Sequence, residues 1–157
     1  MKKVGLFFGS FNPIHVGHMI IADFVANNTD LDEVWFVVSP HNPLKEKKSL
    51  LADHHRLSMV RRAVENDVRF KASDVEFGLS QPSYTTVTLA YLKEKYPETE
   101  FSLIMGGDAM ASLPKWKNYE TILSDYSIIV YSRPNHGDFD NILKQGKITV
   151  LDAPMMN

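Results

Sequence analysis

Continuous apolar runs that end at turn residues recur along the chain. Val4 to Phe8 ends at Gly9-Ser10, and Val34 to Val38 ends at Ser39-Pro40. Apolar runs without alternation are typical of strands covered on both faces, as in parallel sheets. A weaker run of mixed charge, Arg69 to Val75, predicts a partly exposed strand. The same pattern predicts further strands at Phe101 to Met105, Ser127 to Tyr131 and Ile148 to Leu151.

Segments with helical periodicity lie between these strands. Asp53 to Glu65 begins with an N-cap type residue and carries apolar residues at helical spacing. The other predicted helices are His15 to Asn27, Tyr84 to Tyr96, Asn118 to Leu123 and Phe139 to Leu143. This alternation predicts right-handed crossovers and a single-domain α/β fold with an open, Rossmann-like doubly wound parallel sheet. Ligands bind such sheets at the carboxyl ends of the strands, where the turn residues fall.

Composition and charge narrow the classes of function that the chain can have. The 157 residues are 44% hydrophobic, enough for one core, and the formal net charge of -2 argues against a nucleic-acid partner. The absence of cysteine excludes a disulfide scaffold, a thiolate metal site and a cysteine nucleophile. The N-terminal apolar run is short and broken, and no window approaches a membrane span. We therefore expect a cytoplasmic protein without a membrane partner, while a homo-oligomer stays open.

The strongest local signal is the stretch GSFNPIHVGH at residues 9–18, which follows the first strand and opens a helix. Backbone amides and the helix dipole favour an anion at such a place. Gly9 lets a phosphate approach the main chain closely. His15 and His18 are three residues apart, so they project on one side of the first helical turn. Two imidazoles there can donate hydrogen bonds to a phosphoryl group.

Three other interpretations of this stretch have less support. A His-x-x-His pair can bind zinc, but the sequence shows no third ligand nearby. Isolated histidines are usually ordinary surface residues, and the glycine-rich context argues against that here. The loop also lacks the G-x-G-x-x-G spacing of a dinucleotide fingerprint. We predict an anion site and no metal site formed by protein side chains.

The stretch matches the nucleotidyltransferase signature G-x-F-x-P-x-H-x-G-H at every specified position, and the chain resembles bacterial nicotinate mononucleotide adenylyltransferases over essentially its full length. The resemblance implies a nucleotidyltransferase fold. It implies catalytic roles for His15, His18 and Lys45, although Leu44 stands where the family often has a histidine. The ATP-binding residues it implies are Gly9, Ser10, Phe11, Gly106, Asp108 and Arg133.

Two further motifs resemble the nicotinate branch of that superfamily. The stretch PSYTTVTL at residues 82–89 is similar to P-S-Y-T-x-x-T-L, and LPKW at 113–116 is similar to L-x-x-W. They imply that Thr85, Thr86 and Trp116 bind the mononucleotide. From the residues alone, a Ser/Thr-capped helix start remains open for the threonines. A rim or core aromatic remains open for Trp116.

The resemblance implies transfer of AMP from ATP to nicotinate mononucleotide, giving nicotinate adenine dinucleotide and pyrophosphate in NAD biosynthesis, with Mg²⁺ accompanying ATP. The attacking phosphate is already an anion at neutral pH, so no protein nucleophile is required. Other readings are another small adenylyltransferase, such as one acting on phosphopantetheine, or a catalytically weak nucleotide-binding module. Preference for nicotinate over nicotinamide mononucleotide is left open.

The C-terminal stretch departs from the family pattern. Family members carry a second phosphate motif, I-S-S-T-x-x-R, after the last strand, and here the sequence reaches Asn157 where that motif would begin. We therefore expect residues 1–157 to form a nucleotidyltransferase domain without its C-terminal phosphate motif and last helices.

Overall fold

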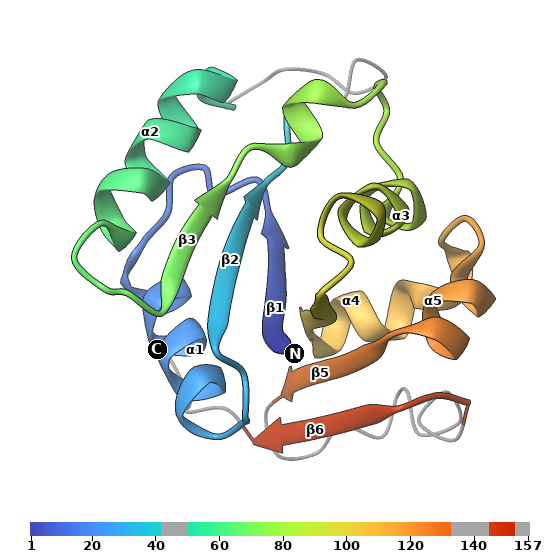
Figure 1. Ribbon diagram of the computed structural model, residues 1–157. Helices are drawn as coiled ribbons and strands as arrows, with labels where there is room; N and C mark the ends of the chain where they lie inside the picture. The colour runs from blue at the N-terminus through green and yellow to red at the C-terminus, as the bar shows by residue number, and fades with distance from the viewer. Residues whose placement is uncertain (42–49, 133–144, 153–157) are drawn as a thin grey trace.

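Six parallel strands form the centre of the molecule (Figure 1). The computed structural model describes residues 1–41, 50–132 and 145–152. The strand order is β3-β2-β1-β4-β5-β6, so the order reverses between β1 and β4. This is the predicted doubly wound sheet. The strands are β1 (Lys2–Gly9), β2 (Glu33–Val38), β3 (Phe70–Ser73), β4 (Thr99–Gly106), β5 (Ser127–Ser132) and β6 (Ile148–Asp152).

Helices cover both faces of the sheet. Figure 1 shows α1 and α2 on one side and α3, α4 and α5 on the other. The α-helices are α1 (Val16–Asn27), α2 (Asp53–Val64), α3 (Thr85–Lys95), α4 (Gly107–Ser112) and α5 (Tyr119–Asp125). Short 3₁₀ turns are η1 (Val75–Gly78) and η2 (Leu113–Lys115).

Alternate residues of the central strands pack into two separate hydrophobic cores, one on each face of the sheet. On β1, Leu6 packs with Leu89 of α3, whereas Phe7 packs in the cluster that contains Ile21 of α1. Strand β1 pairs with β2 on one edge and β4 on the other, so neither edge is free. A Cβ on Gly5 would lie 2.6 Å from a methyl group of Ile104. A larger residue at that position would therefore have to displace the ends of the Ile104 and Leu31 side chains.

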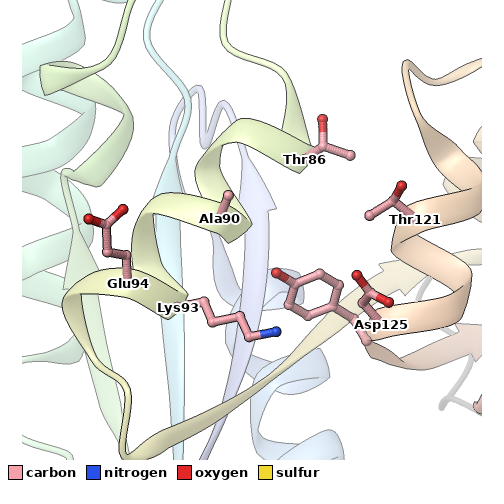
Figure 2. Close-up of a pocket in the computed structure, with 7 residues that line it drawn as sticks. Thr86, Ala90, Lys93, Glu94, Thr121 and Asp125 are labelled. Carbon is pink, nitrogen blue, oxygen red and sulfur yellow. The ribbon is translucent and has the colours of Figure 1, made fainter.

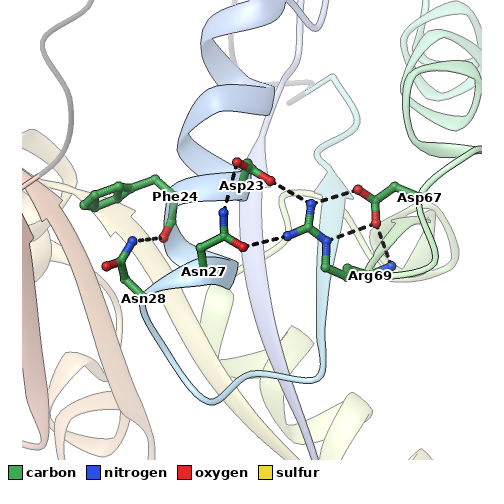
Figure 3. Close-up of polar contacts among 6 residues, drawn as sticks. All are labelled: Asp23, Phe24, Asn27, Asn28, Asp67 and Arg69. Carbon is green, nitrogen blue, oxygen red and sulfur yellow. Dashed lines mark hydrogen bonds and ion pairs between the residues drawn. The ribbon is translucent and has the colours of Figure 1, made fainter.

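An ion-pair network fastens the amino-terminal side of the sheet (Figure 3). The Arg69 guanidinium contacts Asp23 at 2.6 Å and Asp67 at 2.9 Å, and it also donates to the Asn27 carbonyl oxygen. Asp23 and Asn27 lie on α1, and Arg69 lies immediately before β3. This network ties an edge strand to a helix at the end of the sheet away from the strand tips. We assign it a structural role.

Several expectations about the elements need correction. Val75 begins η1 instead of ending a strand. Asp53 is the first helical residue of α2, and Ala52 is the N-cap without a side-chain bond. The Asp53 carboxylate instead accepts hydrogen bonds from the His41 amide and from Arg56.

Helix α4 was not predicted. The expected helix at Phe139 to Leu143 lies outside the described residues, and within the described ranges no helix is long and apolar enough to cross a membrane.

Candidate active site

Two adjoining cavities lie at the carboxyl ends of the strands, where the strand order reverses. Phe7, Phe8, Gly9 and Tyr131 line both of them. The first has a volume of about 310 Å³ and is also lined by Ser10, Phe11, His15 and His18. The second has a volume of about 260 Å³ and is also lined by Ser39, Met105, Gly106, Ala109 and Trp116. One end of the site is therefore polar and carries the histidines, and the other is apolar and carries the tryptophan.

The two histidines also cap α1. His15 is the N-cap, and its Nδ1 accepts a hydrogen bond from the Gly17 amide at 3.1 Å. The His18 Nδ1 accepts from the His15 amide at 3.1 Å, which completes a capping box. A ring nitrogen that accepts carries no proton, so each neutral imidazole has its proton on Nε2. The ring centroids are 3.8 Å apart. The local fold thus presents two Nε2–H donors side by side.

His18 is neutral over the physiological range. Its half-buried position and the neighbouring His15 lower its pKa from 6.5 to about 4. A neutral imidazole keeps the Nδ1 acceptor that caps α1 and the Nε2–H donor that can meet an oxyanion. Hydrogen bonding therefore does not require a protonated imidazolium at this position.

Protonation of His18 is expected to make the free energy of unfolding fall in acid. The folded-state pKa lies near 4 and the unfolded value near 6.5, so the unfolded state binds more protons between these limits. Stability therefore falls as pH drops from about 6.5 toward 4. Denaturant unfolding of the native protein and of His18→Gln, which does not titrate, checks this. The stability difference between the two should change across that window, and parallel pH curves would contradict the assignment.

The loop before α1 uses its backbone differently from the prediction. The amides of His15 and Gly17 are occupied by the imidazoles, so they are not free for a phosphate. A Cβ on Gly9 would lie 3.1 Å from the Phe11 ring, so this glycine makes room for that side chain. Phe11 itself is 2% exposed and has a left-handed φ of 46°. Its ring supports the loop from beneath, and Ser10 is exposed beside it.

The β4 end supplies the other wall. Gly106 and Trp116 line the apolar cavity. A Cβ on Gly106 would lie 3.2 Å from the Tyr131 ring, so the missing side chain admits that ring. Asp108 is exposed in the first turn of α4, and its charge adds to burial in raising the pKa of Tyr131.

Trp116 is both a core residue and a wall of the cavity. It is half-buried and packs against the core under α3 and α4, and its Nε1 donates to the Ser112 hydroxyl at 3.2 Å. The loop that carries it also reaches the start of α3, because the Lys117 ammonium lies 4.7 Å from the centre of the Tyr84 ring. The structure therefore brings the tryptophan loop and the PSYT segment together at one rim.

The two threonines differ in their surroundings. Thr85 is the half-buried first residue of α3. Thr86 lines a separate groove of about 340 Å³ between α3 and α5, together with Lys93, Thr121 and Asp125 (Figure 2). The Thr86 side chain therefore does not line the strand-tip cavities. Lys45 and Arg133 lie outside the described residues.

The structure adds buried polar residues that were not singled out as part of the site. Arg56 has no exposed surface, and its guanidinium donates to the carbonyls of Ser10, Ser39 and Leu51. Glu76 is 4% exposed and accepts a hydrogen bond from Thr88. The sequence did carry a signal for Arg56, because it follows Asp53 by three residues on a predicted helix. Glu76 had no comparable local pattern.

Within the described ranges, no group of three or more His, Asp or Glu residues is arranged to hold a metal ion.

The chain is similar to known proteins along nearly its whole length. A family model described as cytidylyltransferase-like matches residues 6–155. A probable nicotinate-nucleotide adenylyltransferase from Flavobacterium psychrophilum is 54% identical over 155 residues, which cover 98% of this chain and 80% of the relative. A protein of the same description from Bacteroides fragilis is 45% identical over 153 residues, covering 98% and 76%.

Solved structures agree on the fold. A Plasmodium falciparum nicotinic acid mononucleotide adenylyltransferase complexed with NaAD matches with a TM-score of 0.84 at 24% identity, covering 100% of this chain and 78% of that chain. A putative nicotinate-nucleotide adenylyltransferase from Vibrio parahaemolyticus matches with a TM-score of 0.71 at 23% identity, covering 94% and 83%.

Proposed function

This chain belongs to the nicotinate-nucleotide adenylyltransferase family, and we propose that its strand-tip cavities join ATP to nicotinate mononucleotide. The products are nicotinate adenine dinucleotide and pyrophosphate, and the reaction serves NAD biosynthesis. The observation that carries the assignment of the site is the pair of Nε2–H donors at one end of a cleft whose other end is walled by Trp116.

The proposed chemistry is a direct in-line displacement. A phosphate oxygen of the mononucleotide attacks the α-phosphorus of ATP. The bond from that phosphorus to the bridging oxygen breaks, and pyrophosphate leaves with the bonding electrons. His15 and His18 donate to the α-phosphoryl oxygens as negative charge develops on them. Because the attacking oxygen is already anionic, the protein contributes position and charge stabilisation and supplies no nucleophile.

The other residues predicted to bind ATP fall into two groups, one near the phosphates and one near the nucleoside. We propose that Gly9, Ser10 and Phe11 shape the loop beside the phosphates. We further propose that Gly106 and the exposed Asp108 contact the nucleoside of ATP, where the carboxylate suits ribose hydroxyls. We also propose phosphate contacts for Lys45 and Arg133. Magnesium bound to ATP would neutralise phosphate charge and help pyrophosphate leave.

The mononucleotide end is proposed to lie between Trp116 and the start of α3. The indole wall suits a flat pyridine ring, and Tyr84 and Thr85 stand across the rim. Thr86 can contribute there through its backbone amide, since its side chain lines the outer groove. We propose a cytoplasmic enzyme whose partners are these two small molecules.

Trp116→Ala is expected to raise KM for nicotinate mononucleotide about fivefold, because aromatic contacts of this kind contribute on the order of 1 kcal/mol. KM for ATP should stay within about twofold, since the tryptophan is at the opposite end from the histidines. Steady-state kinetics with each substrate varied provides the measurement, and Trp116→Phe serves as the control that keeps an aromatic face. Thermal unfolding of the alanine variant should be followed in parallel. An unchanged KM in a folded variant would leave Trp116 as a core residue only.

Substrate identity is tested by pyrophosphate release from ATP with nicotinate mononucleotide, nicotinamide mononucleotide or phosphopantetheine. We expect the nicotinate compound to give the highest kcat/KM. Preference for phosphopantetheine would replace the proposed function with its nearest alternative. ATP binding without pyrophosphate release would indicate a nucleotide-binding module.

A further inference from the structure

A buried carboxyl group outside the two cavities takes no part in the chemistry above. Glu76 belongs to η1, which connects β3 to the segment before α3, and it is 4% exposed. The hydroxyl of Thr88, itself fully buried in α3, donates to its Oε2 at 2.7 Å. The Ser39 hydroxyl also stabilises the ionised form of the same carboxyl group and so lowers its pKa. Glu76 therefore joins the end of β2 to the first turns of α3.

Ser39 is in turn hydrogen-bonded to residues of the histidine loop, the stretch at residues 9–18. Its amide donates to the Gly9 carbonyl at 2.9 Å. Its carbonyl accepts from Arg56 at 2.7 Å, and the same guanidinium nitrogen donates to the Ser10 carbonyl. The Ser39 amide is thus bonded directly to the histidine loop, and the Ser39 carbonyl is linked to the same loop through Arg56.

The connection continues into the mononucleotide side. Thr88 stands one turn into α3, and its amide bonds to the Tyr84 carbonyl at 3.1 Å. Tyr84 in turn contacts Lys117, next to Trp116. A chain of polar contacts therefore runs from Gly9 and Ser10, through Ser39 and Glu76, to the helix start at the mononucleotide rim.

Burial of this carboxyl group carries a cost that an apolar side chain would avoid. Burial raises the pKa of Glu76, and the bonds from Thr88 and Ser39 oppose that rise. An apolar residue of similar size would fill the space without desolvating a carboxyl group. What an apolar residue lacks is a directional link between two loops. In-line displacement depends on such a link, because a misplacement of about 1 Å can cost roughly a hundredfold in rate.

We propose that Glu76 is a positioning residue that fixes the start of α3 against the histidine loop, so that the mononucleotide phosphate meets the α-phosphorus of ATP in line. The proposal rests on the proposed function for its kinetic consequence. Its structural consequence, an ordered first turn of α3, holds whether or not that function is right.

Glu76→Ala, Glu76→Gln and Thr88→Val separate this role from general stability. Glu76→Gln keeps the shape and can bond to both hydroxyls, whereas Thr88→Val removes one hydrogen bond at nearly constant volume. We expect Glu76→Ala and Thr88→Val to lower kcat/KM for the mononucleotide about tenfold or more, with KM for ATP within about twofold. Glu76→Gln should restore most of that loss.

Hydrogen exchange provides a readout that needs no turnover. The amides of Val87 and Thr88 bond to the Tyr84 carbonyl and report on the first turn of α3. Their exchange should be on the order of tenfold faster in Thr88→Val than in the native protein, while amides of β1 stay unchanged. A native protein without adenylyltransferase activity would overturn the proposed function and leave this exchange prediction standing. Unchanged exchange or an unchanged kcat/KM for the mononucleotide in Thr88→Val, or an equal loss of kcat/KM for both substrates, would overturn the positioning role.

Discussion

Replacement of His18 by alanine is expected to lower kcat by about a hundredfold or more, with little change in KM for the mononucleotide. Loss of one preorganised donor to a developing oxyanion typically has an effect of this size. The interaction strengthens as the transition state forms, so the rate changes more than ground-state binding. The Nε2–H is available at neutral pH because Nδ1 accepts from the His15 amide and the ring is neutral. Single-turnover kinetics at saturating substrates gives the most direct measurement.

A control is needed because His18 also caps α1. His18→Ala removes the acceptor for the His15 amide as well as the donor. His18→Glu keeps an acceptor at the same helix position, as in an ordinary capping box, but has no donor when ionised. We expect His18→Glu to fold with a stability closer to that of the native protein and to be as inactive as the alanine variant. A folded His18→Ala protein with native kcat would contradict the catalytic assignment.

Arg56→Ala is expected to lower the free energy of unfolding by about 3–5 kcal/mol, the range found when one partner of a buried ionic contact is removed. The guanidinium is fully buried and bonds to three backbone carbonyls and to Asp53, which would all lose this partner. Two of those carbonyls, from Ser10 and Ser39, belong to segments that line the cavities. Chemical denaturation measures the change, and activity should fall even where the variant remains folded.

Arg61→Ala on the same helix is the matched control. Its pair with Asp74 is 3.4 Å long and both side chains are largely exposed, so its loss should change stability by less than about 1 kcal/mol. Arg56→Lys should be intermediate, because an ammonium keeps the charge but cannot reproduce the planar set of donors. A smaller loss in Arg56→Ala than in Arg61→Ala would show that the buried contacts are not the source of stability.

The sheet could be predicted because the information is local. Each buried strand is a short apolar run followed by a turn, and β1, β2, β4, β5 and β6 all lie where those runs predicted them. The pairing of the histidines was also predictable, since His15 and His18 are near in sequence and their rings lie side by side, although His15 is the extended N-cap and only His18 is helical. The family resemblance stated from its motifs is confirmed by the relatives.

Long-range contacts could not be predicted in the same way. Arg56 reaches Ser10 across 46 residues of sequence, and Glu76 accepts from Thr88 only because η1 packs beneath α3. The same limit applies to Gly9, whose close approach to the Phe11 ring is a tertiary contact that its place in the motif does not reveal. It also applies to the Thr86 side chain, which lines the groove between α3 and α5, because the direction of a side chain depends on how its helix is rotated on the sheet.

The most direct measurement of the central claim follows the phosphorus atoms of ATP. The protein should be incubated with nicotinate mononucleotide and ATP radiolabelled at either the α- or the γ-phosphorus, and the products should be separated. We predict that the α-label enters nicotinate adenine dinucleotide, that the γ-label appears in pyrophosphate, and that both transfers require the mononucleotide. Release of the α-label as free AMP, or of the γ-label as orthophosphate, would contradict direct adenylyl transfer at this site.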